Sequence, residues 1–164
     1  MGQGIAEMLA SKGIDVLLAE KSVSNLDQAV EAIEISLDKQ LEKWAITQAE
    51  KKLIQSKIHK ASTLAEMKGC QLVIESITED LDEKKQLFEQ LDQMFGEHVV
   101  LASNTSTLSL TELAGTTEHP ERVIGLHFLH PVEKIDWVEI IRGVRTSDET
   151  YERKSRIDHF GCGC

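Results

Sequence analysis

The sequence has little proline, little cysteine and no long apolar run, and each shortage argues against a class of protein. With two prolines in 164 residues and no low-complexity segment, long disordered regions are not expected. The three cysteines, at positions 70, 162 and 164, form neither a disulfide framework nor a Cys-x-x-Cys pair. The Cys-x-Cys ending has no cluster of His or Cys around it, so no metal site is expected. No apolar stretch approaches the roughly 20 residues that span a bilayer, so no membrane partner is expected.

Positive charge is also scarce. Eighteen Lys and Arg residues against 28 Asp and Glu residues give a net charge of -10. Because nucleic-acid binding relies on clustered Lys and Arg, this balance disfavours a nucleic-acid partner. An anionic cofactor remains compatible with it, since backbone amides at the start of a helix hold phosphate groups. The N-terminus lacks the basic-then-apolar pattern of a signal peptide, so we expect a cytoplasmic protein, or an organellar one without its targeting segment.

Short apolar runs alternate with segments of helical periodicity along most of the chain. The expected buried strands are residues 15–20, 72–77, 99–102, 122–128 and 137–141. The expected helices are residues 2–12, 26–44, 47–58 and 81–94, with a short one after Ser109. This alternation predicts an α/β domain with a mostly parallel sheet, in which residues 26–58 form an inserted helical hairpin.

Several details of this hairpin follow from local patterns. Ser24 is expected to cap its first helix, and Thr47 with Glu50 forms a capping box before the second. Trp44 is expected to pack within the hairpin rather than to support a ligand. The lysines between residues 51 and 60 are expected to form a solvated face with neighbouring acids, although they could steer an anionic substrate.

The first 20 residues match the later part of a dinucleotide-binding motif. Such a motif has a strand, a Gly-x-Gly-x-x-Gly turn that opens a helix, and a second strand that ends in an acid. Gly2 opens the first expected helix and Glu20 ends the next strand, and the acid favours NAD over NADP, although Lys21 weakens this preference. No strand precedes Gly2, so the first strand of the unit is expected to be missing. Alternatively, Gly2 and Gly4 only allow close helix packing, and Glu20 is a solvated strand end.

Polar residues follow or interrupt three later strands. The segment Ser103–Ser106 follows the strand at 99–102, where open α/β sheets bind ligands, although it could simply be a helix-capping turn. His127 and Glu139 lie near matching positions of two successive strands, joined by a turn through Pro131. A histidine can take the proton of a secondary alcohol as hydride leaves, and a carboxylate behind it orients the ring. Glu139, on an otherwise apolar strand, is expected to be buried and therefore paired. A lone strand histidine is otherwise usually structural.

With these segments the sequence resembles the 3-hydroxyacyl-CoA dehydrogenases, including the bacterial 3-hydroxybutyryl-CoA dehydrogenases. The motifs are Ser-Asn-Thr-Ser at 103–106, Gly-Leu-His-Phe at 125–128 and Val-Glu-Ile-Ile-Arg-Gly at 138–143. They occur in the family's order, and the resemblance runs from Met1 to about Glu152. It implies a Rossmann-like domain with NAD as cofactor, and oxidation of a (S)-3-hydroxyacyl-CoA to a 3-oxoacyl-CoA, or the reverse. Family members are homodimers whose interface lies in a C-terminal helical domain.

The resemblance also implies residue roles. His127 is implied as the catalytic base, Glu139 as the group that orients it, and Ser106 as a contact to the substrate oxygen. The implied cofactor contacts are Gly2, Glu20, Glu79, Lys84, Asn104, Ser106 and His130, and the implied contacts to the CoA ester are Ser36, Lys43 and Ser106. His130 stands where the family usually has Asn, so it either replaces that amide as a donor or marks an altered site. Ser36 and Lys43 could instead belong to a solvated helix face.

The family resemblance also predicts how the chain is divided into domains. Residues 1–143 are expected to be the NAD-binding domain, incomplete at its N-terminus, and residues 144–164 a truncated, atypical tail in place of the helical domain. An exposed strand edge and an open site imply little or no activity for this chain alone. Two alternatives remain: a non-catalytic NAD-binding or interaction module with the same fold, and a dehydrogenase of free β-hydroxy acids. The sequence around His127 and the hairpin favour CoA esters.

Overall fold

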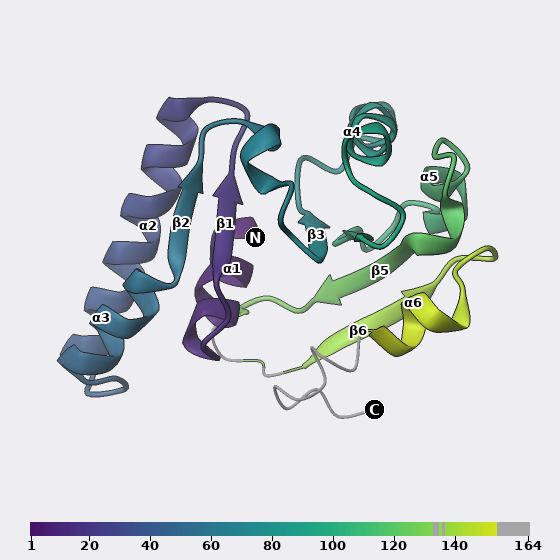
Figure 1. Cartoon of the computed structure of the whole chain (residues 1–164). Coiled ribbons are helices and arrows are strands. Elements are labelled where there is room, and N and C mark those ends of the chain that lie inside the picture. The colour runs from purple at the N-terminus through teal and green to yellow at the C-terminus, as the bar shows by residue number, and fades with distance from the viewer. Residues whose placement is uncertain (133–134, 136, 154–164) are drawn as a thin grey trace. The chain divides into compact units, whose positions relative to one another are not determined.

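The computed structural model describes residues 1–132, 135 and 137–153. The chain divides into two compact units, shown with their elements in Figure 1. The first unit comprises Met1–Met67 with His130–Lys134, and the second comprises Lys68–Leu129 with Ile135–Cys164. In the part of the chain that is described, no helix is both long enough and apolar enough to cross a membrane.

The first unit is a small parallel sheet with helices. Its elements are α1 (Gly2–Ser11), β1 (Val16–Ala19), α2 (Val23–Glu42), α3 (Gln48–Ser56), β2 (Ile58–Ala61) and the 3-10 turn η1 (Leu64–Met67). Gly13, with φ +86°, turns the chain between α1 and β1 in a conformation that favours glycine. Because β1 pairs with β2 in parallel, the α2–α3 hairpin connects two neighbouring strands. The predicted helical-hairpin insertion is therefore confirmed.

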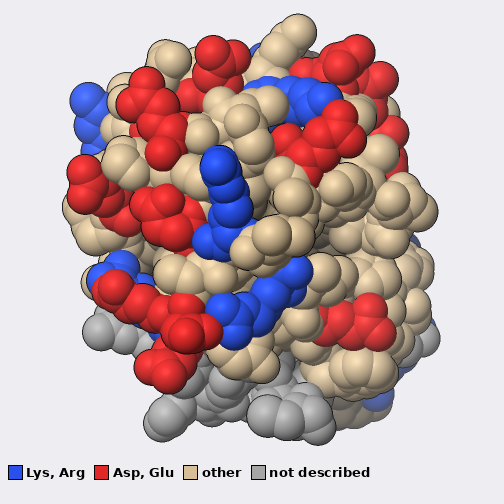
Figure 2. Space-filling view, turned by 90° about the vertical axis from the view of Figure 1, so that its right-hand side faces the viewer, with Lys and Arg blue, Asp and Glu red and all other residues tan. Residues whose placement is uncertain are grey.

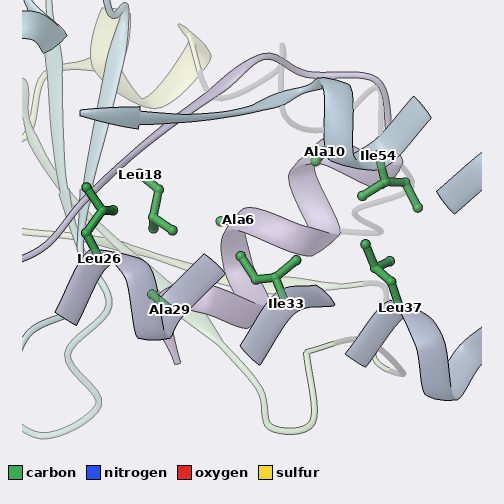
Figure 3. Packing of buried hydrophobic residues seen from close by; sticks show 8 residues of the cluster. All are labelled: Ala6, Ala10, Leu18, Leu26, Ala29, Ile33, Leu37 and Ile54. Carbon is green, nitrogen blue, oxygen red and sulfur yellow. The ribbon is translucent and has the colours of Figure 1, made fainter. Parts of the chain in front are cut away.

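The core of the first unit lies between α1 and the hairpin. On α2, apolar residues recur every three or four positions, so that one face of the helix is buried. On α1 the buried positions facing this core are small, which allows α2 to approach closely. The cluster, shown in Figure 3, consists of Ala6, Ala10, Leu18, Leu26, Ala29, Ile33, Leu37 and Ile54.

The second unit carries a four-stranded sheet. Its elements are β3 (Leu72–Glu75), α4 (Leu81–Met94), β4 (Val100–Ser103), α5 (Leu110–Ala114), the 3-10 turn η2 (Pro120–Arg122), β5 (Val123–Phe128), β6 (Val138–Arg142) and α6 (Asp148–Arg153). The strand order is β3-β4-β5-β6, with the first three parallel and β6 antiparallel to β5. The carboxyl ends of β3, β4 and β5 therefore share one edge of the sheet. This arrangement confirms the predicted α/β class with a mostly parallel sheet.

A buried ion pair lies at the opposite, amino-terminal edge of this sheet. The guanidinium of Arg122 donates to Asp92 Oδ1 at 2.7 Å, and both side chains are 3% exposed. The same guanidinium donates to the carbonyl oxygens of Gly96 and Val99, just before β4. Because each buried charge has a partner and further hydrogen bonds, the pair ties α4 to the starts of β4 and β5.

Three predicted features of the hairpin are wrong. Ser22, not Ser24, caps α2: its backbone is extended, so its hydroxyl reaches Asn25 N at 3.1 Å, whereas Ser24 lies in the first helical turn. The helix ends at Glu42 rather than at Trp44. Trp44 does not pack within the hairpin, because its left-handed backbone (φ 58°) ends the helix and leaves its side chain 94% exposed. The capping box of Thr47 and Glu50 is confirmed.

The strand β2 was not predicted. We expected α3 to continue to Ile58, but it ends at Ser56, and Ile58–Ala61 pair with β1. Two of the four strand residues, His59 and Lys60, are exposed, so the segment lacks the apolar run by which the other strands were recognised. Pairing with β1, rather than local propensity, makes this segment a strand.

The segment expected to be an atypical tail is described as far as Arg153. Residues 154–164, including both C-terminal cysteines, lie outside the described residues. Within the described part, the hydroxyl of Thr146 donates to Val123 O at 2.6 Å, and Thr150 of α6 is buried. The described part of this segment thus packs onto β5 within the second unit.

Candidate active site

The two residues expected to form a catalytic pair lie side by side in the second unit. His127 is on β5 and Glu139 is directly opposite on antiparallel β6, as the strand register shows. His127 Nδ1 lies 2.8 Å from Glu139 Oε2. The juxtaposition predicted from two successive strands is confirmed. The expectation that Glu139 is buried is wrong: its side chain is 48% exposed, because residues alternate faces along β6 and Val138 takes the buried one.

The hydrogen bond to Glu139 assigns different tasks to the two ring nitrogens of His127. A carboxylate accepts hydrogen bonds, so Nδ1 carries the hydrogen that it donates to Glu139. In the neutral ring Nε2 then has the free lone pair and is the atom able to accept a proton. A ring that gains a proton there becomes a cation, which the adjacent carboxylate stabilises. The His127 side chain is 24% exposed, so a reactant can reach it.

Close packing of β5 on β6 sets the geometry of this pair. Two residues before His127, Gly125 faces Ile141, and a Cβ at Gly125 would lie only 2.9 Å from Ile141 Cβ. A Cβ atom essentially never lies within 3.0 Å of another residue's carbon atom. Glycine at position 125 therefore allows β6 to lie against β5 where His127 and Glu139 pair.

Asn104 fixes the end of β5 next to His127. It follows β4, and its side-chain Oδ1 accepts the backbone N–H of Phe128 at 2.9 Å. Its Nδ2 donates to the hydroxyl of Ser76, just past β3, at 3.2 Å. One amide thus links the carboxyl ends of three strands. Sequence analysis expected Asn104 near the reacting groups, and the structure places it adjacent to the residue after His127.

Glu79 holds the loop that follows β4. Its Oε1 accepts hydrogen bonds from the hydroxyls of Thr105 and Thr107, the latter at 3.1 Å, and from the backbone N–H of Ser106 at 3.3 Å. Partial burial raises the pKa of Glu79, but these hydroxyls and the ammonium of Lys84 outweigh it and lower the pKa to about 2. Glu79 therefore carries a negative charge beside Ser106, whose own side chain is exposed.

Lys84 is buried between two carboxylates. Its Nζ lies 2.6 Å from Glu75 Oε1 and 3.3 Å from Glu79 Oε2, and its side chain is 1% exposed. Glu75, at the end of β3, also accepts the hydroxyl of Ser103 at 2.7 Å. The sequence resemblance placed Lys84 among the cofactor contacts, and the structure encloses its ammonium within this network.

In the first unit, the start of α1 and the end of β1 fit the requirements of a dinucleotide. The first hydrogen bond of α1 runs from Ile5 N to Met1 O, so the amides of Gly2, Gln3 and Gly4 have no acceptor within the helix. No acid lies in the first turn, which leaves the helix start suited to a phosphate anion. The turn at Gly13 reverses the chain, so the end of β1, followed by exposed Glu20, lies toward the start of α1. These residues fit the pyrophosphate and ribose of NAD.

The residues expected to contact the CoA ester lie on α2. Ser36 donates its hydroxyl to the buried carboxylate of Glu7 at 3.1 Å, and Gln40 donates to the same oxygen at 2.5 Å. Lys43, the C-cap residue of α2, is exposed. His130 is also exposed, at the start of the segment that joins the first unit. The structure thus gives Ser36 a partner within the protein and leaves Lys43 and His130 accessible.

Three of the four lysines between residues 51 and 60 pair with neighbouring acids, but Lys51 is buried, so the expectation of one solvated face is wrong for it. Lys51 pairs with Asp38, Lys57 with Asp15 at 2.9 Å, and Lys60 with Asp27. On the face seen in Figure 2, Lys and Arg are interspersed with Asp and Glu and do not form a continuous basic surface. Among the described residues, no group of three or more His, Cys, Asp or Glu could hold a metal ion.

Glu75 and Ser76 were not predicted from the sequence, and neither was the contact that Ser103 makes with Glu75. For Glu75 a signal existed, because an acid inside the apolar run Leu72–Ile77 is buried and requires a partner. Ser103 was recognised only as part of the polar segment after β4, and its bond to Glu75 depends on strand register. Ser76 meets Asn104 only through the sheet, so no local pattern could reveal it.

The family model described as "3-hydroxyacyl-CoA dehydrogenase, NAD binding domain" matches residues 1–158. The chain belongs to this family. As in the family's description, NAD is the cofactor of the domain.

Relatives of this family member include two bacterial enzymes. The 3-hydroxybutyryl-CoA dehydrogenase of Bradyrhizobium diazoefficiens is 38% identical over 152 residues, which are 93% of this chain and 52% of the relative. That of Clostridioides difficile is 37% identical over 152 residues, or 93% of this chain and 54% of the relative. The chain thus spans about half the length of the curated relatives it matches.

Solved structures of family members show the same fold. The (S)-3-hydroxybutyryl-CoA dehydrogenase of Ralstonia eutropha matches 99% of this chain and 58% of its own with a TM-score of 0.93 and 36% identity. The 3-hydroxybutyryl-CoA dehydrogenase of Escherichia coli K12 matches 99% of this chain and 34% of its own with a TM-score of 0.93 and 32% identity.

Proposed function

We propose that this chain is the cofactor-binding part of an NAD-dependent dehydrogenase that oxidises (S)-3-hydroxyacyl-CoA to 3-oxoacyl-CoA. In the reverse direction the enzyme would reduce 3-oxoacyl-CoA to (S)-3-hydroxyacyl-CoA. The observation that carries the proposal is the contact between His127 Nδ1 and Glu139 Oε2 at 2.8 Å on opposed strands. This pair can accept the proton of a secondary alcohol, and the fold belongs to an NAD-binding family. A non-catalytic module would have no need of an accessible, oriented base.

In this proposal His127 is the catalytic base. Its Nε2 takes the proton from the 3-hydroxyl group, while Glu139 holds the ring by Nδ1 and stabilises the resulting cation. Ser106, exposed on the loop after β4, contacts the substrate oxygen. Asn104 keeps the end of β5, and with it His127, in place by accepting the Phe128 N–H. NAD, when bound, supplies the acceptor of the hydride.

The cofactor contacts proposed for the first unit lie at the start of α1 and just after β1. In the first unit, the start of α1 at Gly2 would hold the pyrophosphate, and Glu20 the ribose hydroxyls. His130 is proposed as a further cofactor contact, taking the place of the family's Asn. In the second unit, Glu79 and Asn104 are proposed as cofactor contacts, supported by their hydrogen bonds to the loop after β4 and to the end of β5.

The proposed substrate is an acyl-CoA ester, as the names of the relatives imply for those proteins. Lys43 is exposed at the end of α2 and has the charge to contact a phosphate of CoA. Ser36 is proposed near the CoA moiety as well, held in position by Glu7. We further propose a cytoplasmic location.

The test of the catalytic proposal is acetoacetyl-CoA-dependent oxidation of NADH, followed by absorbance at high protein concentration. Loss of a general base typically costs about 10²–10⁴-fold in rate, so His127→Ala is expected to lose turnover by that factor. Glu139→Gln keeps the side-chain size and removes the charge, so a smaller loss is expected. Free acetoacetate, compared at equal concentration, is expected to react more slowly than the CoA ester.

Two controls separate catalysis from folding and binding. Both variants are expected to retain the NADH affinity of the wild type, because neither residue is assigned to cofactor binding. Exposed Glu89→Gln on α4 makes the same charge change elsewhere and is expected to leave the rate unchanged. A rate that persists undiminished in His127→Ala would contradict the catalytic proposal, whereas the low rate expected of this chain alone would not.

A further inference from the structure

A buried carboxylate with no catalytic or binding task lies at the end of β3. The side chain of Glu75 is 0% exposed and accepts Lys84 Nζ at 2.6 Å, Ser103 Oγ at 2.7 Å and the N–H of Ile77 at 2.7 Å. Burying such an ion pair costs desolvation that its attraction hardly exceeds, and an apolar pair of similar size is often as stable. Stability alone therefore does not require the charges of Glu75 and Lys84. This points to a role in positioning the groups that Glu75 contacts.

Two paths of contacts lead from Glu75 to the loop after β4. The direct path runs through Ser103, whose hydroxyl donates to Glu75 and accepts the N–H of Thr105 at 3.3 Å. The second path runs through Lys84, which lies 3.3 Å from Glu79 Oε2, while Glu79 Oε1 accepts the N–H of Ser106 at 3.3 Å. Both paths end on the residues that flank Asn104 or follow it.

We propose that Glu75 is a positioning residue, which acts through Ser103 and Lys84 to hold the loop that presents Asn104 and Ser106 to the cofactor and substrate. The inference rests on the proposed function, because that function gives Asn104 and Ser106 their tasks. It also gives Lys84 a task that suits its burial, because its ammonium lies between the carboxylates of Glu75 and Glu79 and sets their separation.

The charge of Glu75, rather than its size, is the property on which this role depends. In Glu75→Gln the side chain keeps its shape, but the ammonium of Lys84 retains only Glu79 as a counter-charge. Lys84 is then drawn toward Glu79, whose carboxylate shifts relative to the N–H of Ser106. The bond from Ser103 also weakens, because its acceptor is no longer ionised.

The test is backbone amide hydrogen exchange, measured by NMR on the full 164-residue chain. In Glu75→Gln the amides of Thr105 and Ser106 are expected to exchange about tenfold faster than in the wild type, as a bond to a charged acceptor weakens. The amide of Leu101, within β4, is the internal reference in each sample. The affinity for NADH, from fluorescence titration, is expected to fall several-fold in the same variant.

Asp92→Asn is the matched control. Asp92 forms the other buried ion pair of the same unit, with Arg122 at the opposite edge of the sheet. This variant loses a comparable pair, so its stability is expected to fall, but exchange at Thr105 and Ser106 relative to Leu101 and the NADH affinity are expected to remain. A purely structural role of Glu75 would make the two variants alike.

Several outcomes would overturn the inference. Exchange at Thr105 and Ser106 that is unchanged in Glu75→Gln, or equally accelerated in Asp92→Asn, contradicts a positioning role. If Glu75→Gln does not fold, Ser103→Ala cuts the direct path alone and must accelerate exchange at Thr105. The wild-type NADH titration tests the proposed function separately, because failure to bind NADH would refute cofactor binding. Whether Glu75 positions the loop is decided by the exchange comparison alone.

Discussion

At the scale of single residues, the site is built from carboxylates that are held by hydroxyl, amide and ammonium donors. Glu139 contacts His127, and Glu75 forms an ion pair with Lys84. Glu79 accepts hydrogen bonds from the loop after β4. Each of these acids needs its charge to perform its task. Protonation of Glu79 should therefore change the structure of the loop after β4 before it unfolds the chain.

Glu79 gives this expectation a pH window. Its pKa in the folded chain, about 2, lies below the ordinary value of 4.5, so its ionised form contributes stability that is fully present above pH 4.5. That contribution is lost as the pH falls from 4.5 toward 2. Glu79→Gln is therefore expected to lower stability at pH 7 and to flatten its fall within this window, as measured by urea unfolding at several pH values.

The control for this prediction is Glu89→Gln on α4, an exposed acid away from the loop. It is expected to leave both the stability at pH 7 and its pH dependence close to those of the wild type. A Glu79→Gln chain whose stability falls as steeply as that of the wild type between pH 4.5 and 2 would refute the assignment.

Sequence patterns predicted some of these residues well and others not at all. The roles of His127 and Glu139 were implied by the family resemblance, and their positions on two successive strands predicted only that they lie side by side. The role of Glu75 could not be deduced, because its partners Lys84 and Ser103 lie 9 and 28 positions away. Contacts of that kind depend on sheet order, which local periodicity does not encode.

At the scale of elements, α2 is held by one buried face. Leu37 is 0% exposed within the core cluster, whereas Ile35 on the same helix is 47% exposed. Leu37→Ala is expected to cost about 2–5 kcal/mol, since it leaves a cavity. Ile35→Ala, an equally drastic change on the solvent face, is expected to cost no more than about 0.5 kcal/mol. Urea unfolding of both variants measures the difference, and equal costs would contradict the packing described for α2.

The contact between β5 and β6 is tested at Gly125. In Gly125→Ala the new methyl group meets Ile141 at 2.9 Å, so β6 must move, and a loss of about 1–3 kcal/mol is expected. Because the same strands carry His127 and Glu139, turnover is expected to fall as well. Gly69→Ala is the control, since nothing lies within 4 Å of the added atom. A stable, fully active Gly125→Ala chain would show that close packing of these strands is dispensable.

Helices and strands were predicted correctly where their sequence periodicity and capping residues were clear. The helix at Leu81–Met94 and the capping box at Thr47 were predicted at their true positions, because periodicity and capping residues agree there. The strand β2 was missed because its exposed His59 and Lys60 carry no strand signal, and only pairing with β1 defines it. A strand such as β2, which forms only because it pairs with a distant strand, cannot be predicted from its local sequence.

At the scale of the whole molecule, a net charge of -10 and an NAD-binding fold have to coexist. The structure reconciles them locally, since the first turn of α1 contains no acid and leaves its amides for a phosphate. Repulsion by the remaining surface acids should weaken binding at low salt. Affinity for NADH is therefore expected to rise modestly between low and physiological ionic strength, as titrations in buffers of increasing salt would show. A strong decrease would instead indicate a basic site that the described residues do not contain.

The central claim, that this chain is an NAD-binding domain of the 3-hydroxyacyl-CoA dehydrogenase family, is tested most directly by fluorescence titration with NADH. The account predicts saturable binding by the wild type and affinity about tenfold or more weaker in Glu20→Ala, since that carboxylate is assigned to the ribose hydroxyls. His127→Ala should bind as the wild type does. Absence of saturable binding, or equal binding in Glu20→Ala, would contradict the account.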